Sequence, residues 1–194
     1  MAAPVANCAV LPESVRTEDA ALIEPLSCAV RGYDVLCSRL ASRVLIHGAG
    51  TMGLMMLQLA KATGAASAAS ADELSPPKYG WDLVVDATGN AKAIQDALGR
   101  DGKGGAYLQF GVAGYATRAT IEPYRIYNQE ITITGSMAAL HSFERAADLF
   151  ATGVIDPGVF IRNRLPLTAF PDAIARFQAS AGRKIQIQPG LKDT

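Results

Sequence analysis

Residues 43–53 read Arg43-Val44-Leu45-Ile46-His47-Gly48-Ala49-Gly50-Thr51-Met52-Gly53, an apolar run that leads directly into three glycines. The β-branched and apolar residues 43–47 predict a buried strand, and residues 52–63 predict an apolar helix that ends at Gly64. In this context Gly48 permits a tight turn, Gly50 lets the backbone approach a pyrophosphate, and Gly53 lets the helix lie close to the strand. The stretch therefore predicts a dinucleotide-binding strand–turn–helix unit.

Two other interpretations of this loop stay open. A strand can pass into a helix through a tight glycine turn that binds no ligand, and a methyltransferase uses a similar loop. The dinucleotide interpretation is favoured because the amides at the start of the predicted helix are unpaired and carry a partial positive charge. Both features suit phosphate groups.

Strand and helix patterns alternate along the rest of the chain. Strands are predicted at 81–87, 106–110, 130–135 and 184–188, helices at 20–36, 91–98, 143–152 and 171–180, and a turn at 102–105. Such alternation predicts an α/β fold, a doubly wound (Rossmann-like) parallel sheet with right-handed crossovers. Ligands of these sheets bind at the carboxyl ends of the strands.

The 17 residues from Gly64 to Gly80 are few for this fold. At roughly 3.3 Å per strand residue and 1.5 Å per helical residue, they cannot supply a strand, a helix and another strand. We therefore expect one βα unit to be missing, including the second strand and its ribose-binding acid. Asp72 lies near the usual position of that acid, but residues 66–71 before it lack an apolar strand pattern, which favours a solvated loop residue. An incomplete sheet exposes strand edges, so we expect a homo-oligomer.

The composition narrows the class of protein. The 18 basic and 18 acidic side chains balance, so the chain lacks the cationic surplus of a nucleic-acid binder. The longest apolar run, residues 52–60, is about half of what a membrane-spanning helix needs. No signal peptide is recognisable at the N-terminus, and the three cysteines have no CxxC spacing. These features predict a cytoplasmic protein with reduced thiols that binds neither nucleic acid nor membrane.

Taken together, the motifs resemble the zinc-dependent medium-chain dehydrogenases, nearest the sorbitol, threonine and polyol dehydrogenase branch. The similar segments are residues 20–30, 44–53, 81–90, 104–112, 131–136 and 182–187. The resemblance implies NAD or NADP as cofactor and a small alcohol or polyol as substrate. It also implies that the strand at 131–134 pairs across a two-fold axis.

The same resemblance implies a set of cofactor-binding residues. The loop residues Gly48, Gly50, Thr51, Met52 and Gly53 would meet the pyrophosphate and the nicotinamide ribose. Residues at later strand ends would line the crevice and contact the nicotinamide end: Thr88, Phe110, Gly111, Val112, Gly135 and Ser136. Ordinary turn chemistry at strand ends is the alternative for each of these later residues.

The family's zinc site is harder to find in this sequence. Glu24 matches the glutamate that neighbours zinc in the polyol branch, but catalytic zinc needs about three protein ligands, and the expected Cys and His-Glu pair are absent. We therefore assign no catalytic residue. We expect a junction and interdomain helix at 1–40, a dinucleotide-binding domain at 41–155 and a C-terminal return segment at 156–194. The two outer segments would be remnants of a catalytic domain.

Three functions remain open on this sequence. The first is a zinc-binding alcohol or polyol dehydrogenase that transfers hydride between a secondary alcohol and NAD(P), with doubtful activity alone. The second is a non-catalytic nucleotide-binding or dimerisation module. The third is a zinc-free reductase of the same superfamily, and Glu24-Pro25 argues against it because this pair belongs with the zinc branch.

Overall fold

A computed structural model describes residues 4–5, 8–37, 40–65, 67–70, 77–179 and 184–191. A five-stranded sheet forms its centre, in the order β2-β1-β3-β4-β5. The strands are β1 (Arg43–His47), β2 (Ser67–Ser70), β3 (Trp81–Asp86), β4 (Asp101–Gln109) and β5 (Thr132–Gly135). Every neighbouring pair is parallel, which confirms the predicted α/β parallel sheet.

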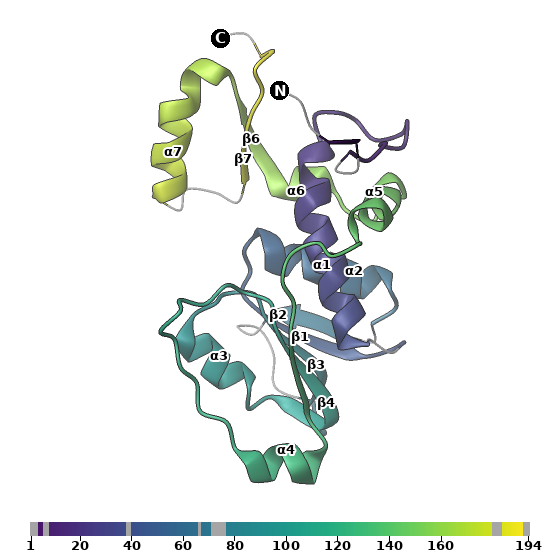
Figure 1. Cartoon of the computed structure of the whole chain (residues 1–194), viewed down its shortest axis with the longest axis vertical. Helices are drawn as coiled ribbons and strands as arrows, with labels where there is room; N and C mark the ends of the chain where they lie inside the picture. The colour runs from purple at the N-terminus through teal and green to yellow at the C-terminus, as the bar shows by residue number, and fades with distance from the viewer. Residues whose placement is uncertain are drawn as a thin grey trace.

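Helices cover both faces of the sheet (Figure 1). A 3₁₀ turn (Ala20–Leu22) leads into α1 (Ile23–Leu36), which packs with α2 (Thr51–Ala62) and α5 (Phe143–Ala151) on one face. The other face contacts α3 (Ala91–Ala97), and α4 (Pro123–Gln129) lies against β4. The sheet is therefore doubly wound, as the alternating pattern predicts.

Successive side chains along the strands point to opposite faces of the sheet, so the core consists of two clusters. Val44 and Ile46 of β1 face the larger cluster with α1, α2 and α5, whereas Leu45 faces the smaller cluster with α3. Side chains of a strand point alternately to opposite faces, so a strand that is apolar throughout must be covered on both. This double burial explains the apolar residues on consecutive positions at 44–46 and 83–85.

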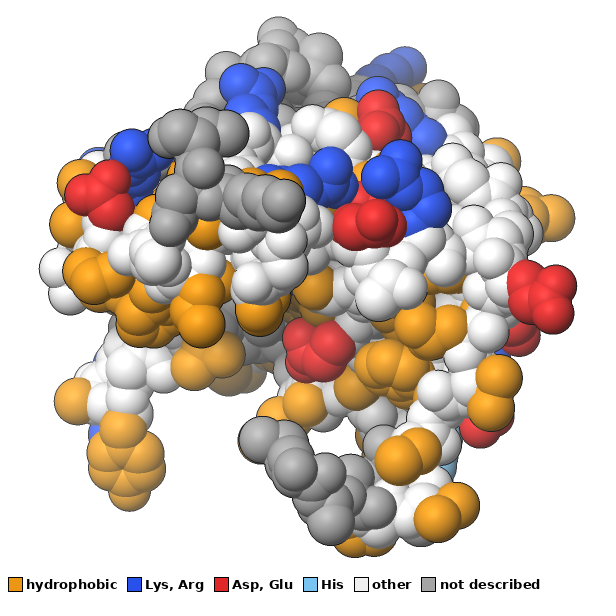
Figure 2. Space-filling model, turned by 90° about the horizontal axis from the view of Figure 1, so that it is seen from above, with side chains coloured by type: hydrophobic (Ala, Val, Ile, Leu, Met, Phe, Trp, Pro, Cys, Tyr) orange, Lys and Arg blue, Asp and Glu red, His pale blue; other side chains and the backbone are white. Residues whose placement is uncertain are grey.

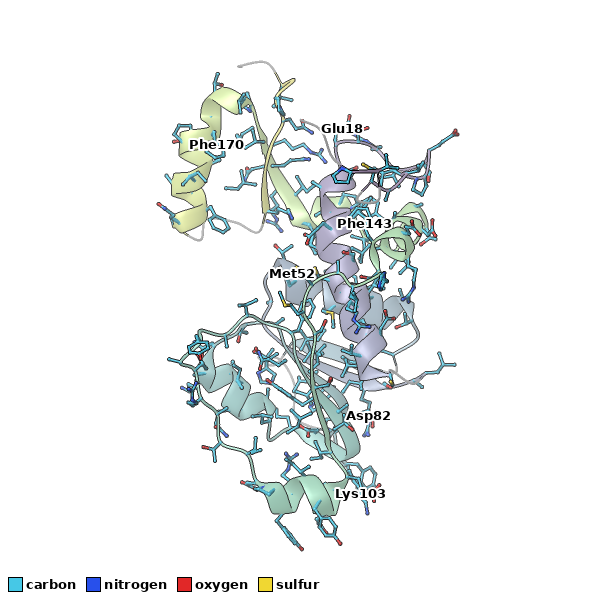
Figure 3. The ribbon with its side chains drawn as sticks, viewed as in Figure 1. Glu18, Met52, Asp82, Lys103, Phe143 and Phe170 are labelled. Carbon is cyan, nitrogen blue, oxygen red and sulfur yellow. The ribbon has the colours of Figure 1, made fainter. Side chains whose placement is uncertain are left out.

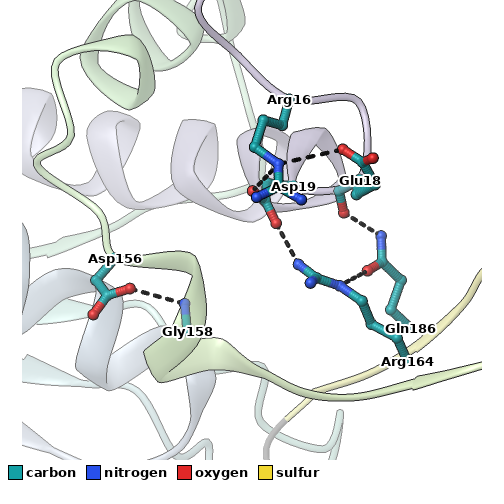
Figure 4. A network of polar contacts seen from close by, with 7 residues as sticks. All are labelled: Arg16, Glu18, Asp19, Asp156, Gly158, Arg164 and Gln186. Carbon is teal, nitrogen blue, oxygen red and sulfur yellow. Dashed lines mark hydrogen bonds and ion pairs between the residues drawn. The ribbon is translucent and has the colours of Figure 1, made fainter.

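A second, smaller unit lies beyond the carboxyl ends of the central strands (Figure 1). It holds α6 (Pro157–Phe160), β6 (Ile161–Leu165), a 3₁₀ turn (Leu167–Ala169), α7 (Phe170–Gln178) and β7 (Lys184–Ile187), with β6 and β7 forming a parallel two-stranded sheet. The sequence predicts α7 and β7 but not β6, α4 or α6. Figure 4 shows how the unit is fastened: Arg164 pairs with Asp19, and Gln186 donates to the backbone carbonyl of Glu18.

Two expectations about the sheet are wrong in part. A strand does occupy the position beside β1, because β2 pairs with β1 in register from Arg43 and Ser67 onward. Compared with the usual six-stranded order 3-2-1-4-5-6, the described sheet lacks the strand beyond this one. Residues 102–105 belong to β4 rather than to a separate turn, although the pairing register shifts there and Gly104 has a φ of +71°. Asp72 lies outside the described residues.

The surface mixes side chains of several kinds. Viewed from above, Figure 2 shows Lys and Arg side chains beside Asp and Glu side chains, with hydrophobic side chains between and below them. Among the described residues, no helix is long and apolar enough to cross a membrane.

Candidate functional site

The glycine loop between β1 and α2 has the geometry that the motif predicts. Gly48 has a φ of +110°, which L side chains rarely adopt, and an added Cβ would lie 2.9 Å from Cγ2 of Thr88. A Cβ on Gly53 would collide with the carbonyl oxygen of Gly48, so the helix can approach the strand only with glycine there. These two glycines are required by the chain's own packing.

Gly50 is different, because no protein atom lies within 4 Å of a Cβ built at this position. Its φ is −73°, so the backbone does not require glycine either. Gly50 is also the N-cap residue of α2, and it has no side chain that could cap the first amides of the helix. The open space therefore faces the positive end of a 12-residue helix, where an anionic group is stabilised.

The turn after β3 is organised by Asp86, whose side chain is fully buried. Its carboxylate accepts hydrogen bonds from the Thr88 hydroxyl at 2.6 Å and amide at 3.2 Å, and from the Gly89 amide at 2.9 Å. The Thr88 hydroxyl also accepts from the amide of Asn90 at 2.9 Å. Thr88 thus lies at the predicted crevice, but its hydroxyl serves the turn and its methyl group packs against Gly48.

The turn after β4 lies directly against this one. Gly89 has a φ of +68°, and a Cβ there would collide with the carbonyl group of Val112. A Cβ on Gly111 would likewise meet the backbone of Thr88 and Gly89. Phe110 and Gly111 both donate their amides to the Asp86 carbonyl oxygen, at 3.0 Å and 2.7 Å. The two turns therefore form one continuous backbone surface.

The end of β5 completes the row of strand ends. Ser136 follows Gly135 and donates its amide to the carbonyl of Gln109 at 3.3 Å. The Ser136 hydroxyl oxygen is buried and makes no hydrogen bond with any described residue. A buried hydroxyl without a partner is uncommon in proteins, and here it lies at the edge where a ligand of this fold binds.

A hollow of about 390 Å³ lies between the glycine loop and the second unit. Thr51 and Met52 line it from α2, and the opposite wall consists of Phe170, Ala173, Ile174, Phe177, Lys184, Ile185 and Ile187. Figure 3 shows Met52 at the start of α2 with Phe170 on α7 beyond it. Lys184 is not among the site residues expected from the sequence. A basic residue at the start of the last strand gives no sign that it will lie across a hollow from the glycine loop.

Glu24 does not belong to a metal site in the described part of the chain. It is exposed on α1, and its carboxylate accepts from the thiol of Cys28 at 3.6 Å. Burial, followed by the charge of Glu24, raises the pKa of Cys28, which disfavours the thiolate that binds metals. Among the described residues, no group of three or more His, Cys, Asp and Glu side chains comes together. These residues do not fit a catalytic zinc ion.

Several relatives of the chain are named as dehydrogenases of polyols. It is 29% identical to D-arabinitol dehydrogenase 1 of Uromyces fabae, over 91% of this chain and 60% of that protein. It is 28% identical to sorbitol dehydrogenase of Macaca fascicularis, over 94% of this chain and 59% of that protein. No known family profile matches the chain.

A solved structure agrees with these relatives. The protein from Sinorhizobium meliloti 1021 bound to NADP, described as a zinc-binding dehydrogenase, is 27% identical. It superposes with a TM-score of 0.78 over 85% of this chain and 57% of its own. The chain thus spans about 60% of the length of the curated relatives it matches. The alignments run over 209 and 215 positions, more than the 194 residues of this chain, so the relatives contain internal residues that it lacks. The comparisons support the resemblance to the polyol branch of the medium-chain dehydrogenases.

Proposed function

We propose that this relative of the medium-chain polyol dehydrogenases binds a nicotinamide dinucleotide along the carboxyl ends of β1, β3, β4 and β5. The observation that carries the proposal is the open space at Gly50, between two glycines that the protein's own packing requires. The chain needs no glycine at position 50 for its own fold, whereas a pyrophosphate at the start of α2 does need one. NADP in a structural relative and polyol substrates in the sequence relatives support the same conclusion.

The chain's own residues would bind and orient the cofactor. The amides at the start of α2 would hold the pyrophosphate, and Lys184, across the hollow, would add a positive charge near it. The backbone surface of residues 110–112 would position the nicotinamide ring, and the Ser136 hydroxyl would gain a hydrogen-bond partner. When bound, the nicotinamide accepts a hydride from an alcohol carbon.

Oxidation of the alcohol is a proposal for the whole enzyme rather than for the described residues alone. In zinc-dependent alcohol dehydrogenases, a metal ion makes the alcohol more acidic. The described residues form no metal-binding group of this kind. We therefore propose that the segments 1–40 and 156–194 work as parts of a catalytic domain around the dinucleotide-binding segment 41–155. We propose either NAD or NADP as the cofactor. A cytoplasmic location is also proposed, and the three free cysteines support it.

Calorimetric titration of the purified chain with NAD⁺ and NADH tests the proposal. We expect micromolar binding that is lost in Gly50→Asp, because the carboxylate would occupy the open space and repel the phosphates. Gly190→Asp is the matched control, since Gly190 also has no atom within 4 Å of a built Cβ but lies in a distant turn. If the wild-type chain shows no binding at millimolar cofactor, or if both variants lose it equally, the proposal is wrong.

A second candidate function is a dimerisation module, and the exposed edge of β5 favours it. β5 lies at one end of the sheet, so one side of its backbone is unpaired in the described chain. Ile133 in this strand is 43% exposed. An apolar side chain on an open strand edge favours pairing with a second copy.

A further inference from the structure

Three side chains stand in a row across the carboxyl edge of the sheet. The strand register places His47 of β1 beside Asp86 of β3, and Asp86 beside Gln109 of β4. Leu45, Val84 and Tyr107, each two residues earlier in its strand, all belong to the core cluster under α3. Because side chains two residues apart share a face, the whole row lies on that face of the sheet.

The nitrogen and the oxygen of the Gln109 amide group are both hydrogen-bonded. Its nitrogen donates to the carboxylate of Asp86 at 2.8 Å and to the carbonyl oxygen of Gly111 at 2.7 Å. Its oxygen accepts from the hydroxyl of Tyr107 at 2.5 Å. An amide whose two hydrogens and oxygen are all engaged is held in one orientation.

The two groups that receive hydrogen bonds from Gln109 belong to the two turns of the crevice. Asp86 holds Thr88 and Gly89 in the turn after β3, and Gly111 lies in the turn after β4. One side chain therefore links both turns, in addition to the backbone hydrogen bonds from Phe110 and Gly111 to Asp86. Asp86 is fully buried, so it needs each of its donors. Among the hydrogen bonds given above for its carboxylate, the one from the Gln109 amide crosses to another strand.

We propose that Gln109 is a positioning residue of the cofactor crevice, which sets the distance between the turn at residues 88–89 and the turn at residues 110–112. This inference rests on the proposed function, because it concerns how the same crevice receives the nicotinamide end of the dinucleotide. Gln109 acts through Asp86 and Gly111 and does not itself touch the cofactor. The precision of a site depends on such supporting hydrogen bonds.

Replacement of Gln109 by glutamate should make the contact between the two turns depend on pH. In Gln109→Glu a second carboxyl group would lie at hydrogen-bond distance from Asp86, and two carboxylates so close share one proton. The protonated glutamate can donate to Asp86 and accept from Tyr107, so only the bond to Gly111 is lost. As the pH rises the proton leaves, and repulsion between the two carboxylates separates the turns.

The other ionisable groups of the described residues near this row are His47 of β1, Tyr107 and Asp101 of β4, and Asp96 of α3. His47 Nε2 lies 3.7 Å from Asp96, so these two groups face each other. Burial, followed by the charges of Asp86 and Asp101, raises the pKa of Tyr107, whose hydroxyl therefore stays protonated. All these groups are also present in the wild-type chain, so a comparison with it isolates the carboxyl group at position 109.

The experiment measures NADH binding by calorimetry between about pH 6 and about pH 9 for the wild type, Gln109→Glu and Gln109→Leu. For Gln109→Glu, we expect the Kd for NADH to rise on the order of tenfold from the lowest to the highest pH, after correction for any change in the wild type. Mutation of residues that support metal ligands from the outer shell has effects of this size. Gln109→Leu should bind more weakly at every pH, with no added pH dependence. Gln95→Glu is the matched control, because Gln95 also bridges two segments, through the backbone of Thr120, but far from the crevice.

Amide hydrogen exchange without cofactor provides the second readout. The protection factors of Thr88 and Gly89 should fall with rising pH in Gln109→Glu and stay constant in Gln95→Glu, because only the former disturbs Asp86. If the wild type binds NADH and the Gln109 variants bind it equally well, the positioning role is wrong while the cofactor proposal stands. Unchanged protection factors in Gln109→Glu also overturn the role. A wild type that does not bind NADH refutes the cofactor proposal itself, and with it this inference.

Discussion

Gly89 and Gly104 have almost the same φ angle but different surroundings. Their φ angles are +68° and +71°, yet a Cβ on Gly89 would collide with the backbone of Val112, whereas a Cβ on Gly104 would meet nothing within 4 Å. The left-handed conformation costs a non-glycine residue about 1–2 kcal/mol at either position. The difference in stability between alanine variants at the two positions therefore reports on the close approach of the two crevice turns.

We predict that Gly89→Ala destabilises the protein by about 1–3 kcal/mol more than Gly104→Ala does, which is the usual cost of overpacking. Urea denaturation of both variants measures this difference in the free energy of unfolding. The contact between the two turns would be unimportant for stability if the two variants unfolded at the same urea concentration with equal slopes.

Asp101 is a buried carboxyl group at the start of β4. Neither of its oxygens receives a hydrogen bond from the described residues, and its nearest cation is Arg125 at 3.7 Å. Burial raises the pKa of Asp101 above its ordinary value of 3.8. An interaction with its own backbone amide, followed by the charge of Arg125, only partly opposes this effect. The folded chain therefore holds this proton more tightly than the unfolded chain does.

This pKa shift makes stability depend on pH with a definite sign. The contribution of Asp101 is fully present below pH 3.8 and is lost as the pH rises through the higher folded-state pKa. We predict that Asp101→Asn becomes progressively more stable relative to the wild type between about pH 4 and about pH 7. Urea unfolding of both proteins at several pH values tests this. A stability difference that stays constant, or that changes in the opposite direction, would contradict the raised pKa.

At the scale of whole elements, the sequence predicts those whose neighbours lie close in the chain. The strands at 43–47 and 81–87 are mostly apolar, and the glycine loop marks the start of α2, so local pattern is sufficient for them. β2 reads Ser67-Ala68-Ala69-Ser70, which carries no strand pattern. β2 is a strand because it pairs along the open edge of β1, and the local sequence of β2 carries no information about this partner.

The other missed elements also depend on partners distant in the sequence. β6 contains Arg162, Asn163 and Arg164, and it is stabilised by β7 and by the Arg164–Asp19 pair. α4 has no buried residue, so it shows no apolar periodicity. The same limit applies to the site, because the glycine motif identifies the loop but not the hydrogen bonds that join Gln109 to Asp86 and Tyr107.

The fastening of the second unit gives a prediction at this scale. Asp19 is 7% exposed and pairs with Arg164, which is part of the network in Figure 4. Asp19→Ala should lower the free energy of unfolding by about 1.5–3 kcal/mol, since hydrogen bonds to charged groups contribute this much and alanine offers no acceptor to Arg164. The control is Asp172→Ala, because the Asp172–Arg176 pair on α7 is exposed and such pairs contribute about 0.3–0.5 kcal/mol. Equal effects of the two changes in urea denaturation would show that the Asp19 contact is weak.

At the scale of the whole molecule, the edge of β5 predicts association. We expect the wild-type chain to form a dimer and Ile133→Lys to shift it toward monomer, because a lysine on an edge strand opposes pairing with another strand. Leu191→Lys is the matched control, since Leu191 is 42% exposed and Ile133 is 43% exposed. Sedimentation equilibrium measures the mass. A wild-type monomer, or equal loss of dimer in both variants, would contradict pairing through β5.

The contact between Asp19 and Arg164 also affects how the protein is made. The two residues are 145 positions apart, and Glu18 and Gln186 are 168 positions apart. A ribosome that adds about 5–20 residues per second needs on the order of ten seconds to deliver Arg164 after Asp19 has emerged. During that interval the carboxylate of Asp19 remains in water, while the strands of the central sheet emerge in turn. The segment around Asp19 therefore reaches its final place only after β6, which is made much later, has also emerged.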